Sequence, residues 1–124
     1  MSKFLIGRLK GCGYAFKGAI MLLRTEPSIQ VQAILAVIMT IAGWLFHITP
    51  IEWMIQIICI GLIMSLEGMN TAIEAIADFI HPDFHVKIGR IKDLAAGAVF
   101  ITAITSIVVG CFIYIPYLIE LFDV

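Results

Sequence analysis

Three carboxylates and one amide recur at helical spacing near the middle of this chain. Counted from Glu67, the residues Asn70, Thr71, Glu74 and Asp78 follow at positions +3, +4, +7 and +11. At 100° per residue these side chains fall within one narrow stripe of an α-helix. The stretch continues a long apolar segment, and ionisable side chains in a membrane helix are costly, so we interpret the stripe as a functional site.

The residue types in this stripe suit a divalent cation and a phosphorylated substrate. Mg²⁺ prefers oxygen ligands, and usually takes one or two carboxylates together with substrate phosphates. Glu26, directly before Pro27, adds an acid at the start of an earlier apolar segment. We therefore predict phosphoryl transfer, in which metal and cations offset charge and one carboxylate, Glu67, orients or deprotonates the attacking hydroxyl.

Familiar soluble kinase motifs are absent from the sequence. Gly13 and Gly18 have the spacing of a Walker A loop, but Ala19 follows where Lys-Ser/Thr is required, and there is no protein-kinase catalytic loop. The three cysteines are far apart and fit no metal-ligand spacing. A phosphoryl-transfer site in this chain must therefore be built on membrane helices.

The composition identifies an integral membrane protein. Of its 124 residues 61% are hydrophobic, and the mean hydropathy is +1.05, well outside the range of soluble domains. We predict a single all-α domain over 1–124, with membrane spans at about 28–47, 51–80 and 92–119. The stretch of about 3–24 mixes cations, glycines and apolar residues, and predicts an amphipathic helix on the membrane surface. We expect no cleaved signal peptide.

The distribution of charge predicts the orientation in the membrane. All eight Lys and Arg residues either precede the first span or lie between the second and third. By the positive-inside rule, the N-terminus and the polar, turn-like segment 81–90 are cytoplasmic. Glu67 then lies about 24 Å along the second span from Ile51, in the inner leaflet, and Glu74 lies about 10 Å further on. The stripe would thus run from a depth that lipid reaches to one that a soluble nucleotide reaches.

Two motifs resemble a known family. Residues 67–78 read E-x-x-N-T-A-I-E-x-x-x-D and residues 92–99 read K-D-x-A-A-G-A-V, a pattern similar to the prokaryotic diacylglycerol kinase family of small membrane lipid kinases. The resemblance covers nearly the whole chain from Gly13 onward. Residues 51–54 and 65–67 look more like its undecaprenol kinase branch, typical of Gram-positive bacteria, than its enteric diacylglycerol kinase branch.

The resemblance implies a homotrimer in the bacterial cytoplasmic membrane, with active sites shared between subunits, and Mg²⁺- and ATP-dependent phosphorylation of a lipid hydroxyl. On matching positions it implies Glu67 as the catalytic base and Glu26 and Glu74 as metal ligands. The residues expected around the nucleotide are Tyr14, Lys17, Asn70, Asp78, Asp83, His85, Lys92 and Asp93. Gly68 and Ala96 are expected to face the lipid, although Gly68 would also suit a close helix contact.

Three classes of function remain open on the sequence alone. A lipid kinase acting on undecaprenol is favoured, and a kinase acting on diacylglycerol to give phosphatidic acid is the alternative. A small proton or cation transport subunit would explain the buried acids but not the cations clustered beside them. A structural protein whose polar stripe joins helices is the remaining interpretation. ATP consumption that depends on an added lipid alcohol would separate the kinases from the other two.

Overall fold

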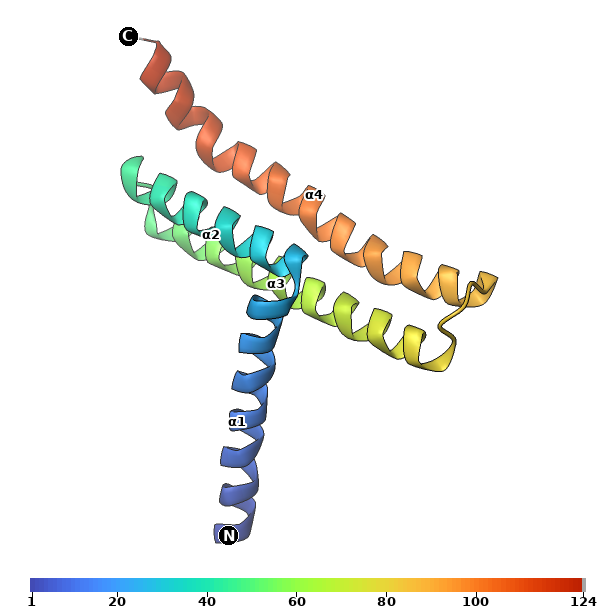
Figure 1. Cartoon of the computed structure of the whole chain (residues 1–124). Coiled ribbons are helices and arrows are strands. Elements are labelled where there is room, and N and C mark those ends of the chain that lie inside the picture. The colour runs from blue at the N-terminus through green and yellow to red at the C-terminus, as the bar shows by residue number, and fades with distance from the viewer. Residues whose placement is uncertain (124) are drawn as a thin grey trace.

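The computed structural model describes residues 1–123 as four helices, shown in Figure 1: α1 (Ser2–Thr25), α2 (Pro27–Leu45), α3 (Pro50–Ile80) and α4 (Val86–Phe122). The last three are long and apolar enough to cross a membrane. The expected all-α fold, with three spanning helices after an N-terminal helix, is therefore confirmed.

Sequence signals at the helix starts explain where the chain turns. Pro27 and Pro50 each occupy a first helical position, where proline loses no intrahelical hydrogen bond. Thr49 and Glu52 form a capping box on α3: the Glu52 backbone N–H donates to Thr49 Oγ1 (3.3 Å), and the Thr49 N–H donates to Glu52 Oε2 (2.9 Å). The short turn between α2 and α3 contains His47 at φ 53°, and its side chain is exposed.

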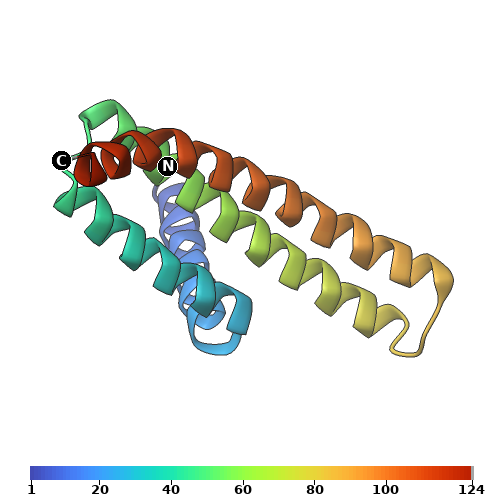
Figure 2. The same ribbon diagram turned by 90° about the horizontal axis from the view of Figure 1, so that it is seen from above.

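Helix α3 is the central element of the bundle, because it contacts both α2 and α4. Figures 1 and 2 show α3 and α4 running side by side along most of their length, with α2 beside the half of α3 that begins at Pro50. Most apolar side chains of these helices are exposed, including Ile57, Ile101 and Phe112. In a spanning protein such surfaces are covered by lipid or by other subunits.

A buried polar contact joins the three spanning helices near the α2–α3 turn. Gln56 of α3 is 6% exposed, and its Oε1 accepts a hydrogen bond of 2.5 Å from the Tyr114 hydroxyl of α4. Gln56 Nε2 also donates to the Met39 carbonyl of α2, at 3.1 Å. Close by, Tyr117 donates to Glu52 at 2.7 Å. Hydrogen bonds between helices satisfy polar groups that the hydrocarbon layer cannot solvate.

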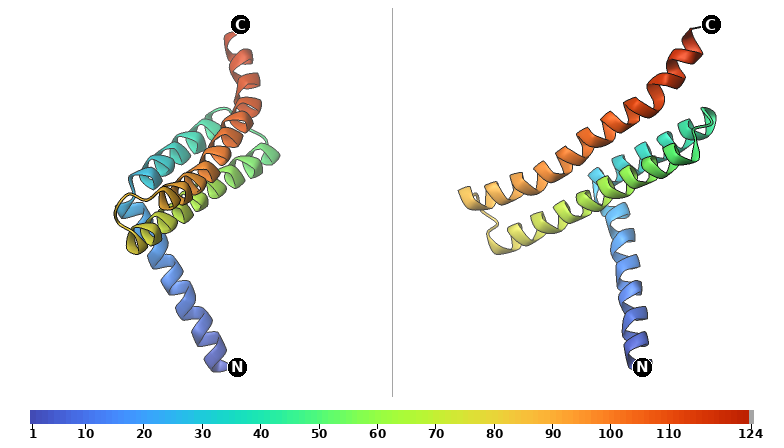
Figure 3. Two further views of the ribbon diagram at one scale, coloured as in Figure 1. Left: turned by 90° about the vertical axis from the view of Figure 1, so that its right-hand side faces the viewer. Right: turned by 180° about the vertical axis from the view of Figure 1, so that it is seen from behind.

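Helix α1 leaves the bundle and runs across the direction of the other three helices, as Figures 1 and 3 show. It is continuous despite its four glycines, none of which has a positive φ, and it buries no residue within the protomer. A helix that crosses the spans in this way has the direction needed to lie along a membrane surface.

The connection between α3 and α4 is shorter than the sequence suggested. The segment 81–90 was expected to be a loop, but α4 already begins at Val86, so the prediction is wrong for residues 86–90. His85 explains the early start, because its Nδ1 accepts from the Lys87 backbone N–H (3.1 Å) and so caps the helix. The polarity of these residues reflects a solvated helical turn and not a loop.

Candidate functional site

The acid-bearing stripe is present as one face of α3. Glu67 and Asn70 are half-buried, whereas Glu74 and Asp78, further along the helix, are exposed. Asn70 Nδ2 donates to Glu74 Oε1 at 3.4 Å, one turn along the helix. Because a carboxylate only accepts hydrogen bonds, this contact orients the amide, with its nitrogen toward Glu74.

Asn70 has an acceptor that nothing in the protomer satisfies. Among the described residues, its Oδ1 is one of two buried side-chain atoms without a hydrogen-bond partner. A buried amide oxygen left unpaired is destabilising. Its position beside Glu74 leaves it free to accept from a donor, or to face a cation, that a ligand brings.

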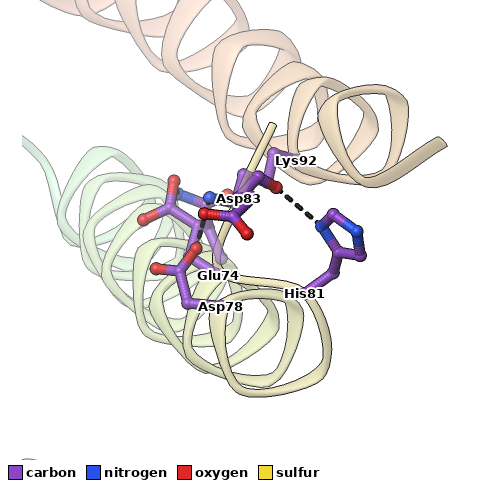
Figure 4. A network of polar contacts seen from close by, with 6 residues as sticks. Glu74, Asp78, His81, Asp83 and Lys92 are labelled. Carbon is purple, nitrogen blue, oxygen red and sulfur yellow. Dashed lines mark hydrogen bonds and ion pairs between the residues drawn. The ribbon is translucent and has the colours of Figure 1, made fainter. Parts of the chain in front are cut away.

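An ion pair joins α3 and α4 near the short segment that connects them. Lys92 Nζ of α4 lies 2.5 Å from Asp78 Oδ1 of α3, and Figure 4 shows these side chains turned toward each other, with Glu74 on the same side of α3. The Lys92 and Asp78 side chains are 37% and 59% exposed, so water and solutes reach them. The structure thus brings Asp78 and Lys92 together, and their role toward a nucleotide stays a prediction.

The α3–α4 connection places two further predicted residues at this end. His81 Nδ1 donates to the Asp83 carbonyl at 2.7 Å, as Figure 4 shows, and the His81 and His85 rings meet edge to face, with centroids 5.1 Å apart. The side chains of Asp83 and His85 are exposed. Asp93, next to Lys92 in α4, is exposed as well.

The remaining expected site residues lie elsewhere in the protomer. Tyr14 and Lys17 are exposed on α1, which Figure 3 shows leading away from the other helices. A single protomer therefore does not bring them to Asp78 and Lys92. Glu26 is half-buried where α1 meets α2, and it accepts a hydrogen bond from the Thr25 hydroxyl at 3.4 Å.

The two residues expected to face lipid differ in their surroundings. Ala96 is exposed one turn beyond Lys92. Gly68 is half-buried, and a Cβ built on it would lie 2.9 Å from Leu22 Cδ1 of α1. Of the two interpretations of Gly68, a close helix contact is the one that the structure shows. Sequence reasoning had passed over Leu22, which carries no chemical signal of its own.

The donor set fits Mg²⁺ better than a metal that needs an all-protein cage. Within residues 1–123 of one protomer, no three His, Cys, Asp or Glu side chains come close enough to hold a metal together. Mg²⁺ keeps several waters and needs only one or two carboxylates when phosphates complete its shell. Glu74, exposed on α3, is a carboxylate of the kind that such an ion takes, and its role as a ligand stays a prediction.

Comparison with known proteins identifies relatives of this chain. The sequence model of the family described as prokaryotic diacylglycerol kinase matches residues 13–114. The undecaprenol kinase of Bacillus subtilis (strain 168) is 42% identical over 95 residues, covering 77% of each chain. The diacylglycerol kinase of Escherichia coli (strain K12) is 34% identical over 106 residues, which cover 83% of this chain and 84% of that one.

Both relatives are lipid kinases by name, and the match extends over the acid-bearing face of α3 and the first turns of α4. A kinase uses a nucleoside triphosphate such as ATP as the phosphoryl donor. The transport and structural interpretations of the stripe are thereby set aside. This chain belongs to the prokaryotic diacylglycerol kinase family and is a membrane lipid kinase.

Proposed function

We propose that this protein phosphorylates undecaprenol to undecaprenyl phosphate, with Mg-ATP as the phosphoryl donor, at the cytoplasmic face of the bacterial inner membrane. The observation that carries the proposal is the α3 face, where a half-buried acid, Glu67, and the unpaired oxygen of Asn70 lie next to exposed carboxylates and Lys92. The 42% identity to an undecaprenol kinase supports this choice of lipid.

Each residue of the face has a role in the proposed reaction. The Glu67 carboxylate takes the proton of the lipid hydroxyl, whose oxygen then bonds to the γ-phosphorus of ATP. The bond from that phosphorus to the β–γ bridging oxygen breaks, and ADP leaves. Lys92 offsets charge on the phosphates, and Asn70 positions the reacting groups.

Glu74 and Glu26 would hold Mg²⁺, which offsets charge on the phosphates when bound. The remaining nucleotide contacts are proposed for Tyr14, Lys17, Asp78, Asp83, His85 and Asp93. Since α1 carries Tyr14 and Lys17 away from the face of its own protomer, the proposal includes a homotrimer in which one subunit's α1 serves the α3 face of a neighbour. Ala96 and Gly68 are proposed to lie beside the lipid.

The orientation in the membrane belongs to the same proposal. All Lys and Arg residues lie in α1, at its junction with α2, or in the first turns of α4, so the positive-inside rule places these elements in the cytoplasm. ATP then meets the site from the compartment that contains it.

A panel of lipid alcohols tests the proposal. Purified protein in mixed micelles is given radiolabelled ATP and undecaprenol, diacylglycerol, both together, or no lipid. We expect label transfer to undecaprenol, with the higher kcat/KM, and little ATP consumption without lipid. A higher kcat/KM for diacylglycerol would make diacylglycerol the substrate in place of undecaprenol. The 34% identity to a diacylglycerol kinase supports that alternative. Lipid-independent ATP consumption would contradict both.

A further inference from the structure

Gly68 allows α1 to touch the acid-bearing helix next to the proposed base. Added to Gly68, a Cβ would lie 2.9 Å from Leu22 Cδ1, closer than packed carbon atoms normally approach. At Gly61, two turns earlier in α3, a Cβ would meet nothing within 4 Å. Gly68 therefore makes room for Leu22, whereas no other side chain of the protomer lies beside Gly61.

An apolar groove of about 220 Å³ opens beside this contact, between α1, α2 and α3. Its lining is apolar except for one hydroxyl, and consists of Ala19, Leu22, Leu23, Ile29, Met64 and Ser65. The Leu22 side chain thus takes part in two features: its Cδ1 lies against Gly68, and the side chain forms one wall of the groove. Leu22 is therefore the lining residue of the groove that Gly68 contacts.

The groove lies where the hydrocarbon chain of the substrate has to run. Met64 precedes Glu67 by three residues, so their side chains are neighbours on the surface of α3. Met64 and Ser65 lie on the side of Glu67 that faces the middle of the bilayer in the proposed orientation. A lipid alcohol with its hydroxyl at Glu67 extends its chain in this same direction.

We propose that Leu22, packed against Gly68, forms the wall that limits this groove to one hydrocarbon chain, the part of a polyprenol that adjoins its hydroxyl group. Leu22 and Gly68 together then determine specificity against lipids with two chains. The inference rests on the proposed function, because it assigns the groove to the same lipid. Cδ1 of Leu22 is the far end of a flexible side chain. A methyl group at residue 68 therefore displaces this side chain without unfolding α1 or α3. The displaced side chain turns into the groove and takes up the room of the lipid chain.

Three variants test this pair, namely Gly68→Ala, Leu22→Ala and the double variant, and Gly61→Ala is the matched control. For each, kcat and KM are measured with undecaprenol, diacylglycerol and ATP, and equilibrium binding of labelled undecaprenol is measured without ATP. We expect Gly68→Ala to raise the KM and the dissociation constant for undecaprenol about fivefold or more, with the KM for ATP unchanged. Leu22→Ala should raise the ratio of kcat/KM for diacylglycerol to that for undecaprenol, and the double variant should regain undecaprenol binding.

The outcomes separate this inference from the proposed function. Gly61→Ala should behave as the unmodified protein in every assay. If the unmodified protein uses undecaprenol but Gly68→Ala and Leu22→Ala leave lipid binding and selectivity unchanged, the specificity role is wrong and the kinase proposal stands. Equal losses for ATP and lipid, without recovery in the double variant, would show a general structural defect and also overturn the role. If the unmodified protein does not use undecaprenol, the proposed function itself fails.

Discussion

Glu67 differs from the other acids of the α3 face in its surroundings. It is half-buried, whereas Glu74 and Asp78 are exposed, so the acids of one stripe are suited to different tasks. An acid at the depth of the lipid hydroxyl is suited to proton transfer, and acids exposed to solvent are suited to a hydrated metal and a nucleotide. Asn70 lies between them in the sequence, and its Oδ1 has no hydrogen-bond partner in the protomer.

Replacing Glu67 by Gln keeps the shape of the side chain but removes its ability to accept a proton. We expect Glu67→Gln to lower kcat by about 100-fold or more, the range that a general base contributes. ATP-dependent phosphorylation of lipid in micelles measures the effect. Glu120→Gln, at an exposed acid near the other end of α4, is the control and should keep full activity. Full turnover by a folded Glu67→Gln protein would remove the proposed role.

Glu74 is expected to act through Mg²⁺. Glu74→Gln removes one charged ligand, so we expect the Mg²⁺ concentration for half-maximal activity to rise about tenfold or more. High Mg²⁺ should restore part of the activity, which it cannot do for Glu67→Gln. The measurement is a Mg²⁺ titration at fixed ATP for both variants. An unchanged titration curve for Glu74→Gln would argue against metal ligation.

At the scale of elements, the spanning helices are tied together at both ends of α3. At one end, Gln56 and Tyr114 form a buried hydrogen bond, and Trp53 packs against the backbone of α2 at Gly43. At the other end, the Asp78–Lys92 ion pair joins α3 to α4. These contacts hold α3 against α4 at two widely separated levels of the bundle.

Gly43 is the position in α2 where this packing tolerates least change. An added Cβ would lie 2.8 Å from Trp53 Cη2 and 3.0 Å from Ile48 Cδ1, and the indole ring is rigid. We expect Gly43→Ala to destabilise the fold by about 1–3 kcal/mol, the usual effect of overpacking. Denaturant unfolding in detergent measures it, with Gly61→Ala as the control, since a Cβ there meets nothing. Equal stability of the two variants would show that α2 is free to move.

At the scale of the whole molecule, one protomer does not bring all the proposed site residues together. Tyr14 and Lys17 are on α1, which extends away from the bundle, whereas Glu67 and Lys92 are on α3 and α4. Large exposed apolar surfaces on the spanning helices leave room for contacts with other copies. A symmetric trimer would supply the missing α1 from a neighbour.

Mixing subunits tests whether the site is shared. Lys17→Ala and Glu67→Gln are each expected to impair the homotrimer severely. If α1 serves a neighbouring α3, random mixed trimers of the two variants contain intact sites about a quarter of the time, and activity should recover to about that fraction. If each protomer served itself, every site would carry one defect and mixing would restore nothing. Activity before and after refolding the mixture distinguishes the two.

The sequence by itself determined the three spanning helices, the N-terminal helix and the acid face of α3, because hydropathy and the 3.6-residue period are properties of neighbouring residues. It also placed Glu67, Asn70, Glu74 and Asp78 on one stripe, since helix geometry alone fixes that relation. The start of α4 was misjudged, because exposed polar turns of a helix have the composition of a loop.

Contacts between helices depend on how each helix is rotated and where it crosses the next, and no local pattern specifies this. The tertiary structure therefore decided that Lys92 meets Asp78, that Tyr114 reaches Gln56 across 58 positions of sequence, and that Leu22 rests on Gly68. It also decided that α1 leaves its own bundle. Pro27 fixes where the chain turns, but the direction that α1 then takes appears only in the assembled helices.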